Sequence, residues 1–193
     1  GENLLNPRFR EIVHTFRSAV PYATIECNTN GDKLTREYAE ELFEFSGLDL
    51  LYINLYDGIE QMEHFDKIMK TIPETKYKYR MHWGDMANHG LILNNRSGVM
   101  DWVGIEESTI EALQGKPCHY PFYKMFVDWN GDVLFCSNDW GREHVVGNLL
   151  SETLHNVWFS KPMNKIRKKL IKGDRSISPC NKCSVDGSLF GKQ

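Results

Sequence analysis

The sequence has no long apolar segment and no excess of basic charge. No apolar run approaches the about 18 residues that a membrane-spanning helix needs, and the first residues lack the basic and apolar segments of a signal peptide. A net charge of −3 and a pI near 6.2 argue against a nucleic acid as the main partner. With 41% hydrophobic and 25% charged residues, the chain has an ordinary globular composition. We therefore expect a folded protein with neither a membrane nor a nucleic acid as partner.

Cysteine is scarce and unevenly placed. The 193 residues contain five cysteines. An odd number without an export signal favours reduced thiols in the cytoplasm over a disulfide framework. Cys27 stands alone and is interpreted as a small buried apolar residue. The other four are the main functional signal of the sequence: Cys118, Cys136, Cys180 and Cys183.

The first half of the chain alternates between helical and extended patterns. Apolar residues recur at helical spacing in residues 7–17, 35–45 and 59–72, and extended apolar segments occupy residues 23–27, 50–55 and 77–83. Strands that alternate with helices of this length predict crossover connections and a parallel sheet, hence an α/β fold. Ligand sites of such sheets gather where strands end, which here is at residues 28–31, 54–58 and 82–85.

The second half contains a predicted β-hairpin. Asn130-Gly131 lies between two extended segments, residues 123–129 and 132–136, and this dipeptide is the strongest short signal of a hairpin. Helical segments follow in residues 154–170. We expect a domain boundary between residues 103 and 104, with a small α+β domain after it. The lysines of residues 161–172 are interpreted as a solvated helix face.

The four later cysteines have the spacing of a metal site. Cys118 lies just before the hairpin and Cys136 ends it, while Cys180 and Cys183 form a C-x-x-C pair. Four thiolates suit either zinc or an iron–sulfur cluster. A zinc ribbon usually has two close C-x-x-C pairs, and this chain has one. The spacing therefore favours a cluster modestly and leaves zinc open.

The same residues resemble a known domain. The order Cys118, Gly131-x4-Cys136, Gly147-Asn148-Leu149, Trp158 and Cys180-x-x-Cys183 resembles the SPASM or shorter "twitch" domain. Such domains follow the catalytic core of radical S-adenosylmethionine (SAM) enzymes and carry auxiliary [4Fe-4S] clusters. Four cysteines imply one auxiliary cluster here. The fold that this resemblance implies is a partial (βα) barrel over residues 1–103 and an iron–sulfur domain over residues 104–193.

The first half resembles the same family. Residues 1–5, Gly-Glu-Asn-Leu-Leu, are similar to the G-E-P-L-L motif that holds the amino group of SAM, with asparagine in place of the usual proline. Thr29-Asn30-Gly31 resembles the T-N-G at the end of the third barrel strand, and Asn54 lies where the fourth strand ends beside SAM. The resemblance thus implies a set of SAM-binding residues: Gly1, Glu2, Thr29, Asn30 and Asn54.

One defining motif of the family is missing from the sequence. The C-x-x-x-C-x-x-C that binds the SAM-cleaving [4Fe-4S] cluster is absent, because the only cysteine before Cys118 is Cys27. We expect residues before Gly1 to supply that motif, so that the chain is the C-terminal part of a longer enzyme.

The resemblance implies an oxidative radical SAM enzyme acting on a peptide or a small molecule, with an electron donor such as flavodoxin or ferredoxin. Candidate acid or base residues at the barrel mouth are Asp57, His82 and Asp85. Two other interpretations remain: a non-catalytic, zinc-stabilised binding module, and a degenerate radical SAM homologue that acts as a peptide chaperone.

Overall fold

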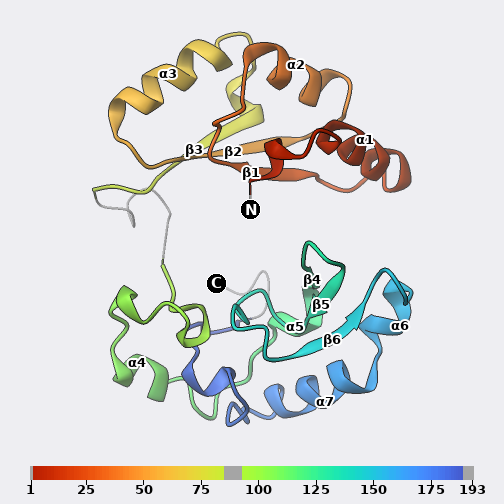
Figure 1. The fold of residues 1–193 in the computed structure, drawn as a ribbon. Helices are drawn as coiled ribbons and strands as arrows, with labels where there is room; N and C mark the ends of the chain where they lie inside the picture. The colour runs from red at the N-terminus through yellow and green to blue at the C-terminus, as the bar shows by residue number, and fades with distance from the viewer. Residues whose placement is uncertain (1, 85–92, 189–193) are drawn as a thin grey trace. The chain divides into compact units, whose positions relative to one another are not determined.

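The computed structural model describes residues 2–84 and 93–188 and shows two compact units, residues 1–92 and 93–193 (Figure 1). The division lies before the boundary predicted between residues 103 and 104. The reason is that Asn95 belongs to the second unit. Its side chain donates to the carbonyl of Lys182 (2.7 Å) and accepts from the backbone N–H of Ser184 (3.1 Å).

The first unit is a parallel sheet with helices on one face (Figure 1). Its strands lie in the order β1-β2-β3, and each pairs in parallel with its neighbour. This confirms the predicted α/β fold. The elements are α1 (Phe9–Ala19), β1 (Glu26–Thr29), α2 (Arg36–Glu44), β2 (Leu50–Leu55), α3 (Ile59–Met69) and β3 (Tyr77–Met81).

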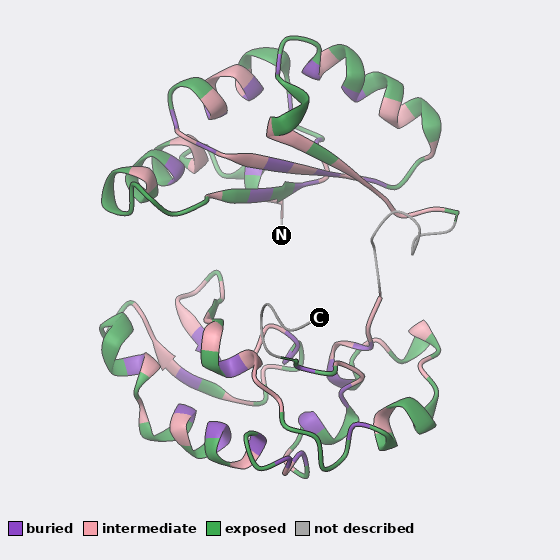
Figure 2. Ribbon diagram, turned by 180° about the vertical axis from the view of Figure 1, so that it is seen from behind, coloured by how far each residue is buried: buried purple, intermediate pink, exposed green. Residues whose placement is uncertain are grey.

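Strict alternation along β2 separates the two faces of this sheet. Buried and half-buried positions alternate along β2, as the burial colours of Figure 2 show. Leu51, Ile53 and Leu55 are fully buried against the helices, and the alternation of a strand places Tyr52 and Asn54 on the other face. Burying each aliphatic side chain stabilises the fold by about 1.5–3 kcal/mol. The helices therefore lie on the apolar face, and the polar face carries none of α1, α2 and α3.

The second unit contains an antiparallel sheet in the order β4-β5-β6. The predicted hairpin is confirmed by the pairing of β4 with β5. Its strands are shorter than predicted, because residues 120–123 form a helical turn, and β6 was not predicted. The elements are α4 (Glu107–Glu111), α5 (Tyr120–Tyr123), β4 (Phe126–Val127), β5 (Asp132–Leu134), β6 (Val145–Asn148), α6 (Leu154–Trp158) and α7 (Lys161–Leu170).

The core of the second unit lies between this sheet and the last two helices. Val133, Val157 and Met163 are fully buried there. Thr153 and Ser160 begin α6 and α7, since each hydroxyl accepts a backbone N–H three residues later. In the described ranges, no helix is both long and apolar enough to span a membrane.

Candidate functional site

The second unit brings the four predicted metal ligands to one cavity. Cys118, Cys136, Cys180 and Cys183 all line it. Cys118 lies just before α5 and Cys136 follows β5. Cys180 begins the short 3-10 turn Cys180–Lys182, and Cys183 directly follows it. All four are free thiols, either buried or half-buried. Segments more than 60 residues apart in sequence therefore converge on a single thiol-lined space.

Burial and mutual repulsion keep the thiols of Cys118, Cys136 and Cys180 protonated when no cation is bound. Burial raises the pKa of Cys136 to about 11, and the neighbouring thiols add to the effect. Burial also raises the pKa of Cys118 and Cys180, with further increases from nearby cysteines. Four negative sulfurs are stable together only around positive charge. The cavity is thus suited to a metal core and unsuited to free thiolates.

Backbone groups around the cavity are oriented towards sulfur. The N–H of Asn138 lies 3.4 Å from Sγ of Cys136, and the N–H of Val185 lies 3.4 Å from Sγ of Cys183. Each donor is two residues after its cysteine. Hydrogen bonds to sulfur favour the thiolate form and tune the potential of iron–sulfur clusters.

The donor set fits a polynuclear cluster. The four cysteine sulfurs are the strong metal donors of the cavity, and no histidine or carboxylate is among its described lining residues, whose other polar members are Ser97, Tyr120, Asn138 and Arg175. Among the described residues, no three His, Cys, Asp or Glu side chains are arranged to hold a single metal ion. Four thiols spread around one shared space are the ligand set of a [4Fe-4S] core.

Glycine at position 187 leaves room for one of these sulfurs. Gly187 has a φ of +72°, and a Cβ built on it would lie 2.3 Å from Sγ of Cys118. Its carbonyl also accepts the backbone N–H of His119 at 2.7 Å. The close approach of the two segments therefore depends on a residue without a side chain.

The polar face of the first sheet carries a hydrogen-bonded side-chain group. Asn54 donates to the carbonyl of Thr29 (3.1 Å), and its Oδ1 lies 3.2 Å from Nε2 of His82. The guanidinium of Arg80 lies 3.7 Å from the centroid of the Tyr52 ring. Such groups, at the carboxyl ends of parallel strands, can bind and orient a polar ligand.

The predicted SAM-binding residues separate into two kinds. The carboxylate of Glu2 accepts from the backbone N–H groups of Leu4 (3.0 Å) and Asn30 (2.8 Å) and from the Thr29 hydroxyl (2.6 Å). Thr29 is buried. The side chains of Glu2 and Thr29 thus hold the loop after β1 in place, while Asn54 lies on the polar face. Gly1 lies outside the described residues.

The predicted acid or base residues are not brought together. Asp57 is exposed just after β2. His82 is half-buried and stacks on Tyr56 with a ring-centroid distance of 4.4 Å. Burial, and then the charge of Arg80, lowers the pKa of His82. No hydrogen bond or ion pair joins Asp57 to His82 in the described part of the chain, and Asp85 lies outside it.

Sequence reasoning missed two groups of residues. Tyr52 and Arg80 could have been found from the strand alternation, which places them on the face of Asn54 and His82. Arg175 lines the cysteine cavity and is almost fully buried. It is a single arginine in an irregular segment, so no sequence pattern identifies it.

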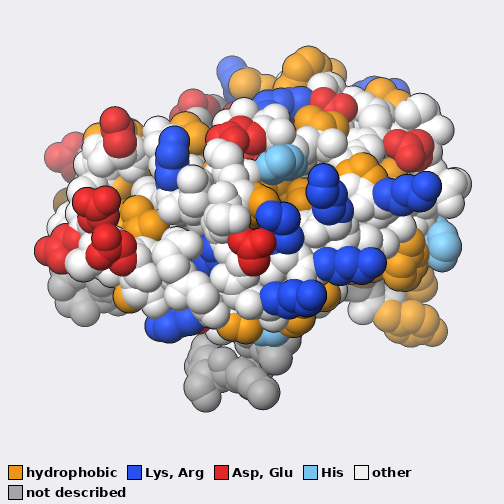
Figure 3. Space-filling view, turned by 90° about the horizontal axis from the view of Figure 1, so that it is seen from below, with side chains coloured by type: hydrophobic (Ala, Val, Ile, Leu, Met, Phe, Trp, Pro, Cys, Tyr) orange, Lys and Arg blue, Asp and Glu red, His pale blue; other side chains and the backbone are white. Residues whose placement is uncertain are grey.

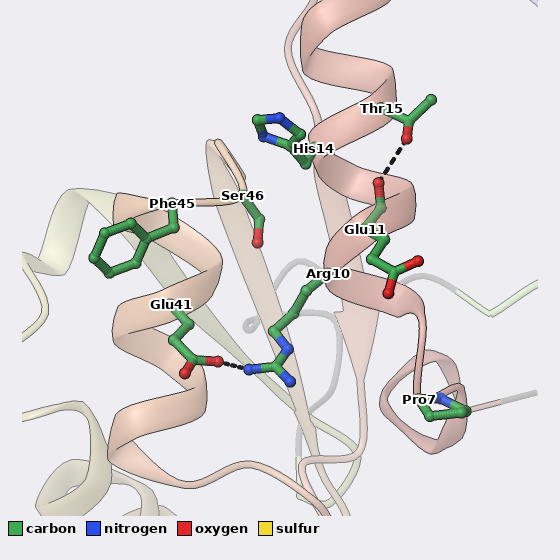
Figure 4. A pocket seen from close by; sticks show the side chains of 8 residues that line it. All are labelled: Pro7, Arg10, Glu11, His14, Thr15, Glu41, Phe45 and Ser46. Carbon is green, nitrogen blue, oxygen red and sulfur yellow. Dashed lines mark hydrogen bonds and ion pairs between the residues drawn. The ribbon is translucent and has the colours of Figure 1, made fainter.

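A groove on the helical side of the first unit is not the candidate site. It lies between α1 and α2, has a volume of about 530 Å³, and contains an ion pair of Arg10 with Glu41 (Figure 4). None of the predicted site residues lines it. Its walls are the helices that cover the apolar face of the sheet, so it lies away from the polar strand ends.

Comparisons with known proteins agree with this geometry. Residues 118–184 match the family model SPASM, an iron–sulfur cluster-binding domain. Over 191 residues the chain is 27% identical to the S-adenosyl-L-methionine-dependent 2-deoxy-scyllo-inosamine dehydrogenase of Niallia circulans. This alignment covers 96% of the present chain and 71% of the dehydrogenase.

Solved structures of BtrN share the fold. The complex of BtrN with AdoMet and 2-DOIA has a TM-score of 0.75 and 25% identity, covering 96% of this chain and 72% of that one. Selenomethionine BtrN in an open conformation has a TM-score of 0.67 and 19% identity, covering 98% and 73%.

Proposed function

We propose that this chain, which is similar to radical SAM/SPASM proteins, belongs to an oxidoreductase that removes hydrogen from a small polar molecule. One observation carries the proposal: Cys118, Cys136, Cys180 and Cys183 line one cavity within the SPASM match. The similar dehydrogenase, which is named for an aminocyclitol, supports a hydroxyl-bearing small molecule over a peptide.

The proposed reaction is a two-electron oxidation of a hydroxyl-bearing carbon. When bound, SAM and the clusters supply a radical that takes a hydrogen atom and an acceptor that takes the remaining electron. The hydroxyl proton then needs a base. The product is a carbonyl compound, and the auxiliary [4Fe-4S] cluster is the proposed electron acceptor.

His82 is the proposed base. The side-chain amide N–H of Asn54 donates to the carbonyl of Thr29, which leaves Oδ1 of Asn54 to accept a hydrogen bond from the Nε2–H of His82. We assign the tautomer from this network, and it leaves Nδ1 of His82 as the free acceptor. The lowered pKa keeps the ring neutral at neutral pH. His82 can therefore accept the hydroxyl proton, while Asn54 orients it.

SAM itself is proposed to lie at the polar strand ends. Asn54 and the loop of Asn30 supply hydrogen-bonding groups there. The Glu2 carboxylate fixes that loop through the backbone of Asn30. Gly1 is proposed to contribute backbone only, as the family resemblance implies.

An acidic one-electron carrier such as flavodoxin or ferredoxin is the proposed redox partner. Lys and Arg side chains gather on the face that carries α7, which Figure 3 views directly. A groove of about 590 Å³ on this face is lined by Lys161, Lys165 and Lys169 together with His144. His144 packs edge-on against Phe135 (5.6 Å between centroids), and Phe135 also lines the cysteine cavity. One aromatic layer thus separates the basic groove from the cavity, and basic charge attracts an acidic carrier.

The carrier assignment is tested by charge reversal. Lys165→Glu should slow electron exchange between the cluster and flavodoxin, and more so at low ionic strength. Lys168→Glu is the control, because Lys168 is an exposed lysine of α7 that does not line the groove. Equal electron-exchange rates for the two variants, measured by stopped-flow absorbance, would refute the docking surface.

The free thiols suit a cytoplasmic location, where such carriers occur.

The reaction is tested with Cys136→Ala in a protein that also contains the residues expected before Gly1. With 2-deoxy-scyllo-inosamine as the probe, we expect this variant to form 5′-deoxyadenosine without the oxidised product. Cys27→Ala is the matched control, because Cys27 is buried in the other unit and should retain oxidation. Unchanged oxidation by Cys136→Ala would refute the role of the cluster. A protein with one zinc, or one that never cleaves SAM, would support the zinc-stabilised module or the degenerate homologue.

A further inference from the structure

A buried arginine lies at the cysteine cavity. Arg175 follows α7 in an irregular segment, is only 2% exposed, and lines the cavity together with all four cysteines. Burying an isolated charge is strongly unfavourable unless opposite charge or hydrogen bonds compensate it. The groups around Arg175 therefore show which partner compensates the charge of its guanidinium.

Within residues 2–84 and 93–188, every hydrogen bond of the Arg175 guanidinium goes to a backbone carbonyl. Nε and Nη2 donate to the carbonyls of Lys116 (2.9 Å) and Pro117 (3.3 Å), which directly precede Cys118. Nη1 and Nη2 donate to those of Val185 (2.9 Å) and Asp186, which follow Cys183. One planar side chain thus ties together the two segments that present Cys118 and Cys183.

No acidic side chain neutralises this guanidinium. In the part of the chain that the structure describes, Arg175 forms no ion pair. The adjacent Asp174 is engaged by Lys169 (3.1 Å) and by Ser176. Carbonyl dipoles satisfy the donors, but they leave the net charge of +1 uncompensated. The charge of Arg175 acts on the thiols of Cys118 and Cys180, whose pKa it lowers against the larger effect of burial. The carboxylate of the neighbouring Asp186 is exposed and forms no ion pair with Arg175 among the described residues.

We propose that Arg175 is the fixed counter-charge of the auxiliary cluster, holding two of its ligand segments in place and raising its reduction potential. The inference rests on the proposed function, because it requires an iron–sulfur cluster in the cavity. A core with four thiolate ligands is anionic, and reduction adds one more electron. A positive charge beside it stabilises the reduced form more than the oxidised form. Arg175 is thus a positioning and potential-setting residue that ligates no metal.

The test uses two substitutions and a matched control. Arg175→Gln removes the charge and keeps amide donors, whereas Arg175→Lys keeps the charge and loses the planar fork. Arg167→Gln is the control, because Arg167 is also buried (7% exposed) and donates to the carbonyls of Pro121 and Trp158. Arg167 does not line the cysteine cavity. The readouts are iron per chain and the midpoint potential from a redox titration followed by electron paramagnetic resonance.

We expect Arg175→Gln to lower the ratio of reduced to oxidised cluster at a fixed potential by tenfold or more, which corresponds to about 59 mV for a one-electron couple. Arg175→Lys and Arg167→Gln should stay near the wild-type potential. If Arg175→Gln does not bind iron but Arg175→Lys does, the counter-charge is still supported. If neither variant binds iron while Arg167→Gln does, the counter-charge is overturned. An unchanged potential in Arg175→Gln also overturns it. If the wild-type protein holds no iron, the proposed function fails instead.

Discussion

Replacing Gly187 by alanine gives the sharpest test of the cysteine site. A Cβ at this position would lie 2.3 Å from Sγ of Cys118 and 3.0 Å from its Cβ. Ordinary contact begins at about 3.4 Å, so the sulfur has to move by about 1 Å. Metal–ligand distances tolerate only about 0.2 Å. The Gly187 segment cannot move away easily, because its carbonyl accepts the N–H of His119. We therefore expect Cys118 to be lost as a ligand.

Gly104→Ala is the matched control for this change. Gly104 also has a φ of +72°, but a Cβ there would meet no atom within 4 Å. Both substitutions carry the same backbone penalty of about 1–2 kcal/mol for an alanine in the left-handed region. In the control this should lower Tm by about 2–8 °C and leave the thiol cavity intact. The clash with Cys118 is the difference between the two variants.

The assay is anaerobic reconstitution with iron and sulfide, followed by iron analysis and absorbance near 400 nm. We expect Gly187→Ala to lose most of its iron and Gly104→Ala to keep the wild-type amount. If both variants hold the same iron, Cys118 is not a ligand or the Gly187 segment moves freely, and the geometric reasoning is wrong.

Three further predictions concern the first unit. Glu2→Ala should lower the free energy of unfolding by about 2–4 kcal/mol, since it removes charged hydrogen bonds to Thr29 and Asn30; an unchanged urea midpoint would contradict this. Burial raises the pKa of Cys27 to about 11, so about one thiol in ten thousand is ionised at pH 7. Iodoacetamide should therefore label Cys27 only after unfolding, and rapid labelling of the folded protein would count against its burial. His82→Ala should abolish substrate oxidation without loss of iron. Because burial lowers the pKa of His82, its neutral, basic form persists to lower pH. The oxidation rate should therefore decrease on the acidic side with a midpoint below pH 6.5, and a midpoint above 6.5 would exclude His82 as the base.

Local signals predicted the elements that local chemistry determines. The alternation in residues 50–55 predicted a strand, and β2 buries Leu51, Ile53 and Leu55 as that alternation requires. Asn130-Gly131 predicted the hairpin, because few residues other than glycine accept the φ of +83° found at Gly131. In these cases one or two residues are enough to determine the structure.

Features that depend on distant contacts could not be predicted in the same way. Strand β6 forms only because β5 is beside it, and the unit boundary is displaced because Asn95 bonds to Ser184, which is 89 positions away. Arg175 binds carbonyls up to 59 positions away. The four cysteines were predicted to form one metal site from the hairpin and the C-x-x-C pair, and their order also resembles a family. The contacts that bring the two pairs to one cavity are a property of the fold.

The metal content of anaerobically purified wild-type protein tests the central claim most directly. Convergence of Cys118, Cys136, Cys180 and Cys183 on one cavity predicts a brown protein with about four irons and four sulfides per chain, attributable to this site. Cys136→Ala should lose them and Cys27→Ala should keep them. A colourless protein with one zinc per chain, or iron retained in full by Cys136→Ala, would contradict the account.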